Sequence, residues 1–157
     1  MTMSSSGSGG DFLAKKSSAT KARDRELPLK TVLVIEDEPR DTNRLVATLN
    51  LMFSYGLEIN TAATLSAALD SAITSPPDLV FLDDVLKPSD DANDSIPYLR
   101  RAGYEGPIVV ISSRATRKRK TQLLSVGAMD VIHKDDVDSV RVSQALETVF
   151  PPDNQTT

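Results

Sequence analysis

Several short apolar runs of this chain end on residues suited to phosphate chemistry. Those residues are Glu36 with Asp37, then Asp83, Ser112 and Lys134. Ligands bind at the carboxyl ends of the strands in a parallel α/β sheet, so carboxylates, a hydroxyl and an ammonium placed there would converge on one crevice. Such a set can hold a divalent metal ion together with a phosphoryl group.

Elements that would position these residues alternate along the chain. The expected strands cover residues 31–36, 57–62, 78–83, 107–112 and 129–133, and the expected helices cover 39–54, 64–74, 95–103, 114–125 and 136–149. Four of the strands are almost continuously apolar, which is typical of strands buried on both faces. The pattern predicts an α/β fold with a doubly wound five-stranded parallel sheet and helices on both faces.

Local signals support the first and last helices. Pro39 suits a first helical turn, and Asp135 or Asp136 is expected to cap the last helix. In that helix Val142, Ala145, Leu146 and Val149 repeat at helical spacing, which predicts one buried stripe.

Composition restricts the metal and the location. The chain has 157 residues, no cysteine and one histidine, His133, so disulfides, thiolate ligands and a multi-histidine zinc site are excluded. Any metal must be held mainly by oxygen, which favours Mg²⁺. No apolar run approaches the roughly 20 residues that span a bilayer, and no signal-peptide core is present, so the expected location is the cytoplasm.

Charge separates the ends of the chain from its body. Residues 1–30 hold six Lys or Arg against three acids, and residues 31–157 hold twelve against nineteen. The acidic body argues against nucleic acid as a partner. We expect a flexible Ser/Gly-rich, basic tail over 1–29, one domain over 30–150 and a disordered end over 151–157. The basic tail is interpreted as an inert linker or as a segment that binds something acidic.

Four motifs together identify a family. Residues 32–39 (VLVIEDEP), 78–83 (DLVFLD), 107–113 (PIVVISS) and 127–134 (GAMDVIHK) resemble the receiver domain of two-component response regulators. The resemblance covers about residues 30–150 and implies the strand order 2-1-3-4-5. It implies a signalling protein rather than an enzyme, with Mg²⁺ as cofactor.

The resemblance also implies a role for each site residue. Asp83 would be the phosphoacceptor, and Mg²⁺ would be bound directly by Asp37, Asp83 and the main-chain carbonyl of Val85. Glu36 would act on the ion through water. Lys134 and Ser112 would contact phosphoryl oxygens.

Each of these residues has an ordinary explanation when taken alone. Adjacent acids favour a helix N-terminus, Asp83 with Asp84 could be a loop pair, Ser112 a turn residue and Lys134 a solvated lysine. The joint spacing, 29 residues from Asp83 to Ser112 and 22 from Ser112 to Lys134, favours a single site.

The expected function is that of a stand-alone, single-domain response regulator. It would receive a phosphoryl group from a histidine kinase or a phosphotransfer protein, and then pass it on or bind a target protein. No membrane partner is expected. The alternatives are a phosphorylation-independent interaction module and, less favoured, an aspartyl-phosphate hydrolase, which usually needs a second acid where Val85 stands.

Some positions depart from the family pattern. Lys87 stands where the family usually has a proline in the loop after the acceptor, and Pro88 follows one position later. Val131 replaces an aromatic switch residue, and Asp135 replaces the proline after the lysine. A switch that couples Ser112 to the rotation of an aromatic side chain is therefore not expected. Signalling must use a different conformational change.

A basic run opens the fourth expected helix. It comprises Arg114, Arg117, Lys118, Arg119 and Lys120. We interpret it either as a solvated face or, together with the fifth strand and helix, as a docking surface for an acidic partner.

Overall fold

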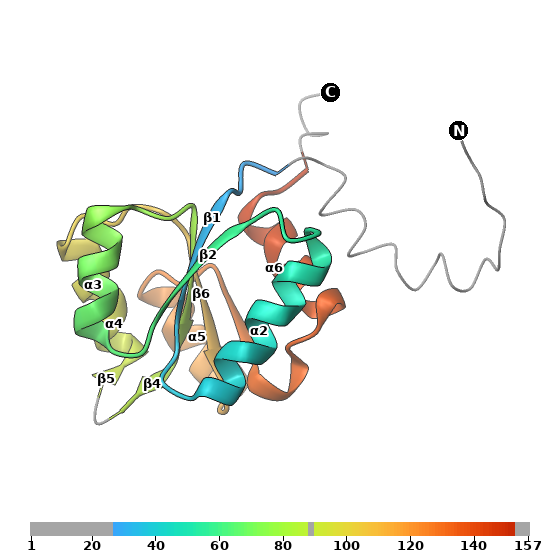
Figure 1. Ribbon diagram of the computed structural model, residues 1–157. Coiled ribbons are helices and arrows are strands. Elements are labelled where there is room, and N and C mark those ends of the chain that lie inside the picture. The colour runs from blue at the N-terminus through green and yellow to red at the C-terminus, as the bar shows by residue number, and fades with distance from the viewer. Residues whose placement is uncertain (1–26, 88–89, 153–157) are drawn as a thin grey trace, which may run out of the picture.

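The computed structural model describes residues 27–87 and 90–152. A five-stranded parallel sheet in the order β2-β1-β3-β6-β7 forms its centre (Figure 1). Its strands are β1 (Thr31–Ile35), β2 (Glu58–Ala62), β3 (Leu79–Asp83), β6 (Ile108–Ser112) and β7 (Asp130–His133). Since β6 and β7 are the fourth and fifth strands of this sheet along the chain, the expected order 2-1-3-4-5 is confirmed.

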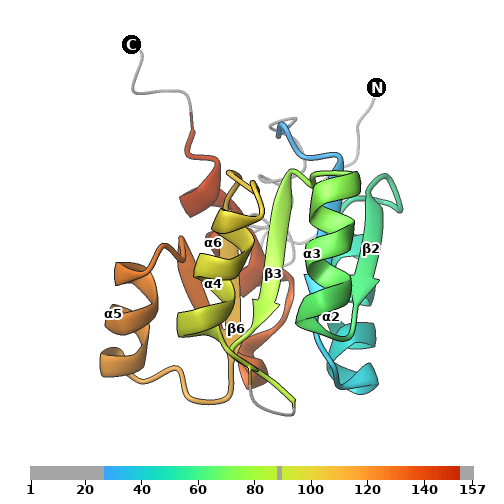
Figure 2. The ribbon, with the colours of Figure 1, turned by 90° about the vertical axis from the view of Figure 1, so that its left-hand side faces the viewer.

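Helices cover both faces of the sheet. One face carries α2 (Pro39–Met52) and α6 (Ser139–Val149), and the other carries α3 (Leu65–Thr74), α4 (Ala92–Arg101) and α5 (Arg117–Ser125), as Figures 1 and 2 show. Successive residues of a strand point to opposite faces. In β1, Val32 and Val34 therefore pack under α2 and α6, whereas Leu33 and Ile35 pack under the other three helices. This double burial explains the continuous apolar runs of the sequence.

Side-chain caps decide where several helices begin. Pro39 occupies the first turn of α2, as expected. Asp91 accepts a hydrogen bond from the Asn93 amide, so α4 begins at residue 92 rather than 95. Thr116 caps α5 in the same way, which moves its start from the expected 114 to 117.

The expected cap of the last helix is wrong. Asp135 and Asp136 lie in a 3-10 turn, η2 (Lys134–Asp136), and α6 starts only at Ser139. Its cap is Asp138, whose carboxylate accepts a hydrogen bond from the Arg141 amide at 2.8 Å. The buried stripe of α6 is confirmed at Val142, Ala145 and Leu146.

A small hairpin that the sequence did not predict follows β3. The two-residue strands β4 (Val85–Leu86) and β5 (Asp90–Asp91) pair antiparallel, at the carboxyl ends of the sheet strands (Figure 2). The displaced Pro88 lies outside the described residues. The hairpin places Asp91 at the start of α4, within reach of the residues after β3.

The described residues extend the packed body slightly before β1. Leu29 is buried with the residues under α2 and α6, while residues 1–26 and 153–157 of the expected tails lie outside the described part. Among the helices of residues 27–87 and 90–152, none is long and apolar enough to cross a membrane.

Candidate functional site

Three carboxylates meet at the carboxyl ends of β1 and β3. The register pairs Ile35 with Leu82, so Glu36 and Asp83 follow at neighbouring positions. One carboxylate oxygen each from Glu36, Asp37 and Asp83 lies within 4.8 Å of the others. Glu36 and Asp83 are buried, while Asp37 is partly exposed. The structure therefore brings together the three acids that the sequence analysis placed at one site.

The electrostatics of this cluster favour a bound cation. Burial raises the pKa of Glu36 to about 8, and the neighbouring Asp83 carboxyl adds to the rise. Burial also raises the pKa of Asp83. Crowded carboxylates resist ionising together unless a positive charge sits among them. Three oxygen donors at this spacing fit a hard ion such as Mg²⁺, which keeps several water ligands.

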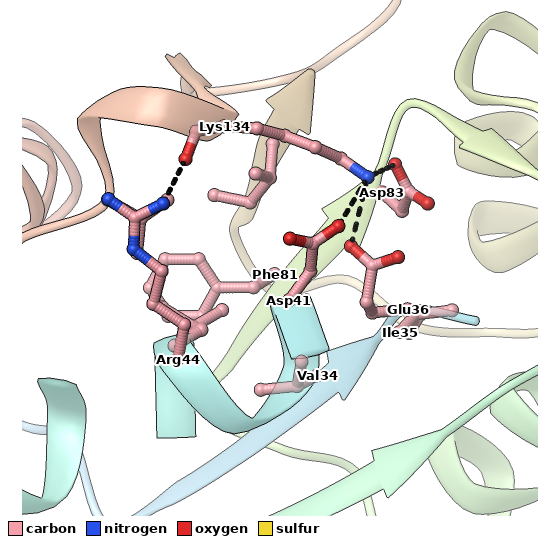
Figure 3. A pocket seen from close by; sticks show the side chains of 11 residues that line it. Val34, Ile35, Glu36, Asp41, Arg44, Phe81, Asp83 and Lys134 are labelled. Carbon is pink, nitrogen blue, oxygen red and sulfur yellow. Dashed lines mark hydrogen bonds and ion pairs between the residues drawn. The ribbon is translucent and has the colours of Figure 1, made fainter. Parts of the chain in front are cut away.

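Lys134 supplies the nearest positive charge. Its Nζ lies 3.4 Å from Asp83 Oδ1 and 3.5 Å from Glu36 Oε1, as the dashed lines of Figure 3 mark. A third contact, 3.1 Å to Asp41 Oδ2, was not foreseen. Burial lowers the pKa of Lys134, but the hydrogen bond to Asp41 and the charges of Asp83 and Glu36 outweigh it, so the pKa is raised. The ammonium is therefore firmly protonated.

The turn that follows β7 is held by a residue of α2. Arg44 donates hydrogen bonds to the main-chain oxygens of Lys134 at 3.0 Å and Asp135 at 3.2 Å. Figure 3 shows Arg44 on the far side of the same pocket, with its guanidinium directed at the backbone of Lys134. The main chain of Lys134 is thus fixed, while its long side chain reaches the acids.

Loop amides complete the acidic side of the site. The Val85 amide lies 3.4 Å from Asp83 Oδ1, and the Lys87 amide donates to Asp37 Oδ2 at 3.3 Å. These contacts hold the start of the hairpin against the carboxylates. They place Val85, the expected carbonyl ligand, directly beside Asp83.

Ser112 lies at the same edge of the sheet, but its hydroxyl points to a different partner. Its Oγ donates to Asp84 Oδ2 at 2.7 Å and accepts from the Arg114 amide at 2.9 Å. The register explains this contact, because Asp83 pairs with Ile111 and the next residues of the two strands are therefore neighbours. The described contacts do not join Ser112 to the cluster of Glu36, Asp37 and Asp83.

A buried ion pair lies behind Ser112. Arg119 donates through Nε to Asp84 Oδ2 at 3.0 Å and through Nη2 to the other oxygen of Asp84, and Nη2 also lies 2.7 Å from Asp91 Oδ1. Burial raises the pKa of Asp84, but the hydrogen bonds from Arg119 and Ser112 outweigh it and hold that pKa below its ordinary value. Both Asp84 and Arg119 are buried.

This pair corrects the interpretation of the basic run. A solvated or docking role is wrong for Arg119, which is 8% exposed. Arg114 and Lys120 also face acids, with Arg114 3.7 Å from Asp84 and Lys120 3.7 Å from Asp130. The sequence showed an acid, Asp84, directly after Asp83, but it did not show that Arg119 of the basic run would be its buried partner.

The fold and the site together define an α/β protein with a magnesium-type carboxylate cluster and a lysine at one sheet edge. Residues 32–147 match the response regulator receiver domain family, and the chain belongs to that family. Receiver domains of two-component signalling are phosphorylated on an aspartate and bind Mg²⁺ at an acidic site of this kind.

Two curated relatives match this chain over part of their own length. The transcriptional regulatory protein KdpE of Mycobacterium tuberculosis is 37% identical over 103 residues, which cover 66% of this chain and 43% of that protein. The alkaline phosphatase synthesis transcriptional regulatory protein SphR of Synechococcus elongatus is 32% identical over 118 residues, covering 68% of this chain and 44% of that protein. The chain spans less than half the length of either relative.

Solved structures share the fold. The receiver domain of NtrX from Brucella abortus is 28% identical with a TM-score of 0.61, covering 74% of this chain and 98% of that one. The CheX-CheY-BeF3-Mg complex of Borrelia burgdorferi matches with a TM-score of 0.66 and 22% identity, over 80% of this chain and 92% of that one. At this lower identity the likeness concerns the fold alone.

Proposed function

We propose that this receiver accepts a phosphoryl group on Asp83 from a histidine kinase or a phosphotransfer protein. It then passes the group on or binds a target protein differently. The observation that carries the proposal is the position of Asp83, a buried carboxylate that lies 3.4 Å from Lys134 Nζ and within the acidic cluster. A carboxylate placed among compensating charges can act as a nucleophile toward phosphorus.

The residues for Mg²⁺ are proposed from the same cluster. Asp37, Asp83 and the main-chain carbonyl of Val85 would bind the ion directly, and Glu36 would act through water. The closeness of the three carboxylates supports this assignment. When bound, the ion would neutralise the acceptor and the phosphoryl oxygens.

Three side chains of the site have defined parts in the transfer. A carboxylate oxygen of Asp83 forms the new bond to phosphorus, and the bond from phosphorus to the donor's imidazole nitrogen breaks. Lys134 brings its ammonium to a phosphoryl oxygen. The Ser112 hydroxyl donates a hydrogen bond to a second phosphoryl oxygen, for which its hydrogen bond to Asp84 must first break.

Intact-mass measurement tests the acceptor. The protein is incubated with Mg²⁺ and phosphoramidate, and the wild type is expected to gain one phosphoryl group. Asp83→Asn should gain none, because its amide cannot form the acyl phosphate. Asp94→Asn, at an exposed acid of α4, is the matched control and should behave as the wild type. Labelling that persists in Asp83→Asn would move the acceptor elsewhere.

Two observations favour a second function, binding without phosphorylation. Ser112 is engaged by Asp84, and Val131, which is 3% exposed, offers no ring to rotate. An interaction module of this kind would not need the metal site. Calorimetric titration with Mg²⁺ separates the two functions, because a receiver that takes up phosphate must bind the ion, whereas absence of both binding and labelling would favour the module.

We place the surface for the target protein on α5, β7 and α6. Arg117 and Lys118 on α5 are exposed and give this surface a positive end, which supports an acidic protein partner. The excess of acids over residues 31–157 supports a protein rather than DNA. Reversing both charges should weaken binding of the partner, once isolated, most strongly at low salt. Unchanged affinity would remove this surface.

A further inference from the structure

Asp83 and Asp84 are adjacent, yet they serve two different networks. Asp83 contacts Lys134, and Asp84 receives the Ser112 hydroxyl at 2.7 Å. The two networks lie at one sheet edge, because Asp83 pairs with Ile111 in the strand register. Ser112 can therefore be drawn toward either neighbour.

A hydroxyl has one proton to donate. Ser112 can give it to the Asp84 carboxylate or to a phosphoryl oxygen on Asp83, but not to both. The bond to Asp84 is short, buried and made to a charged acceptor, and such bonds are stronger than neutral ones. Asp84 is therefore a competitor for the group that a phosphoryl group would recruit.

Arg119 fixes the competitor in place. Its guanidinium contacts both oxygens of Asp84, and it also reaches Asp91 at the start of α4. A bidentate contact between a guanidinium and a carboxylate holds the carboxylate in one orientation. Asp84 Oδ2 thus stays directed at the Ser112 hydroxyl. Its orientation is fixed by Arg119 of α5, which is itself held by Asp91 at the start of α4.

We propose that Asp84 is a positioning residue that withholds the Ser112 hydroxyl from the acceptor site until a phosphoryl group arrives, with Arg119 holding Asp84 for that purpose. The proposal rests on the proposed function at Asp83. The buried ion pair of Asp84 and Arg119 would then couple the acceptor to α5. Val131 cannot supply this coupling by rotating an aromatic ring, because it has none.

A double-mutant cycle tests whether Asp84 acts through Ser112. Initial rates of phosphoryl uptake from phosphoramidate with Mg²⁺ are measured for the wild type, Asp84→Asn, Ser112→Ala and the double variant. Asp84→Asn should accelerate uptake about fivefold in the wild-type background, since an amide oxygen holds the hydroxyl less tightly. In the Ser112→Ala background the same change should have less than about a twofold effect. Equal acceleration in both backgrounds would mean that Asp84 acts by its charge alone, and would overturn the proposal.

A measurement on the wild type alone keeps the test independent of folding of the variants. The Arg114 amide donates to Ser112 Oγ at 2.9 Å, so this amide should exchange its hydrogen about fivefold faster or more once phosphorylation turns the hydroxyl away. The Asp84 amide, bonded to the main-chain oxygen of Ile111 at 2.8 Å, is the internal reference and should not change. Unchanged exchange at Arg114 in a fully phosphorylated sample would overturn the proposal.

The two levels of failure are distinguishable. If the wild type takes up no phosphoryl group, the proposed function and the role of Asp84 both fail. If the wild type is phosphorylated on Asp83 and the cycle shows no coupling, only the role of Asp84 fails.

Discussion

The ammonium nitrogen of Lys134 lies closer to Asp41 Oδ2, at 3.1 Å, than to Asp83 Oδ1, at 3.4 Å. Asp41 belongs to the first turn of α2, so it approaches the lysine from another element than the acceptor does. Lys134 is therefore shared between Asp83 and a residue outside the cluster of Glu36, Asp37 and Asp83. Under the proposed function, a phosphoryl group on Asp83 would have to draw the ammonium away from Asp41.

The first prediction concerns this sharing. Asp41→Asn should raise the rate of phosphoryl uptake from phosphoramidate by up to about fivefold. A partly exposed ion pair contributes about 0.2–1 kcal/mol, and its removal releases Lys134. Intact-mass time courses measure the rate. Asp70→Asn, which removes an exposed acid on α3, is the control and should leave the rate unchanged. Slower phosphoryl uptake in Asp41→Asn would show that Asp41 positions Lys134 for the transfer and does not compete with Asp83 for the ammonium.

The second prediction concerns the metal. Mg²⁺ at a hundred times its Kd should stabilise the wild type by about 2.7 kcal/mol, because a ligand that binds only the folded state adds to its stability. Asp37→Asn should lose most of this gain, since it removes one of the three clustered carboxylates. Thermal unfolding with Mg²⁺ and with EDTA measures the difference. Asp136→Asn, an exposed acid in the turn after β7, should keep the full gain; equal gains in both variants would place the ion elsewhere.

The third prediction concerns pH and the pair of Asp130 and Arg141. Arg141 donates to both oxygens of Asp130, at 2.9 and 3.0 Å. Burial raises the pKa of Asp130, but these hydrogen bonds outweigh it and hold the pKa below its ordinary 3.8. A carboxyl whose pKa is lowered by folding stabilises the native state above its ordinary pKa, and this stability is lost as the pH falls through the folded value.

Asp130→Asn should therefore cost about 2 kcal/mol of unfolding free energy at pH 7, the usual size for hydrogen bonds to a charged group. The cost should begin to shrink as the pH falls below about 4 and should be lost as the pH passes the lowered pKa, because the wild-type carboxyl is then neutral like the amide of the variant. Urea unfolding at pH 7 and at successively lower pH measures this. A cost that stays constant down to the acid limit would show that Asp130 contributes by packing rather than by charge.

The fourth prediction concerns the buried ion pair. Arg119→Met should destabilise the protein by about 3–5 kcal/mol, because it leaves the Asp84 carboxylate, 2% exposed, without its main partner. Arg117→Met, two residues earlier on the exposed face of α5, is the matched control and should stay within about 0.5 kcal/mol of the wild type. Urea unfolding measures both.

A double variant separates charge from packing at this pair. Adding Asp84→Asn to Arg119→Met should recover a large part of the lost stability, since no uncompensated charge then remains buried. Failure to recover would mean that Arg119 stabilises the fold mainly by the packing of its side chain and its bond to Asp91.

Most of the fold could be predicted because the chain carries strong periodic signals. The five sheet strands were expected within one residue of their observed ends, since buried parallel strands such as Leu79–Asp83 are almost continuously apolar. The acids of the cluster follow from the same logic, because residues after neighbouring parallel strands meet at one edge. Helix starts were less predictable, since the first turn of α4 depends on which nearby acid becomes the cap, and this was Asp91.

The contacts that were missed depend on side-chain direction across the sheet. Nothing in the local sequence indicates that Arg119, within a run of cations, is the one turned inward to Asp84. The same holds for Asp41, which resembles any acid in a first helical turn. The hairpin after β3 was missed because two-residue strands carry too little pattern to detect.

The bonds from Arg44 to the main chain of Lys134 and Asp135 have a consequence for how this chain can vary. In the family pattern a proline ring restricts the backbone at position 135, whereas here a guanidinium from α2 restrains it from outside. A variant that loses Arg44 without gaining another restraint at position 135 would therefore leave Lys134 on a turn whose main chain is held by two fewer hydrogen bonds.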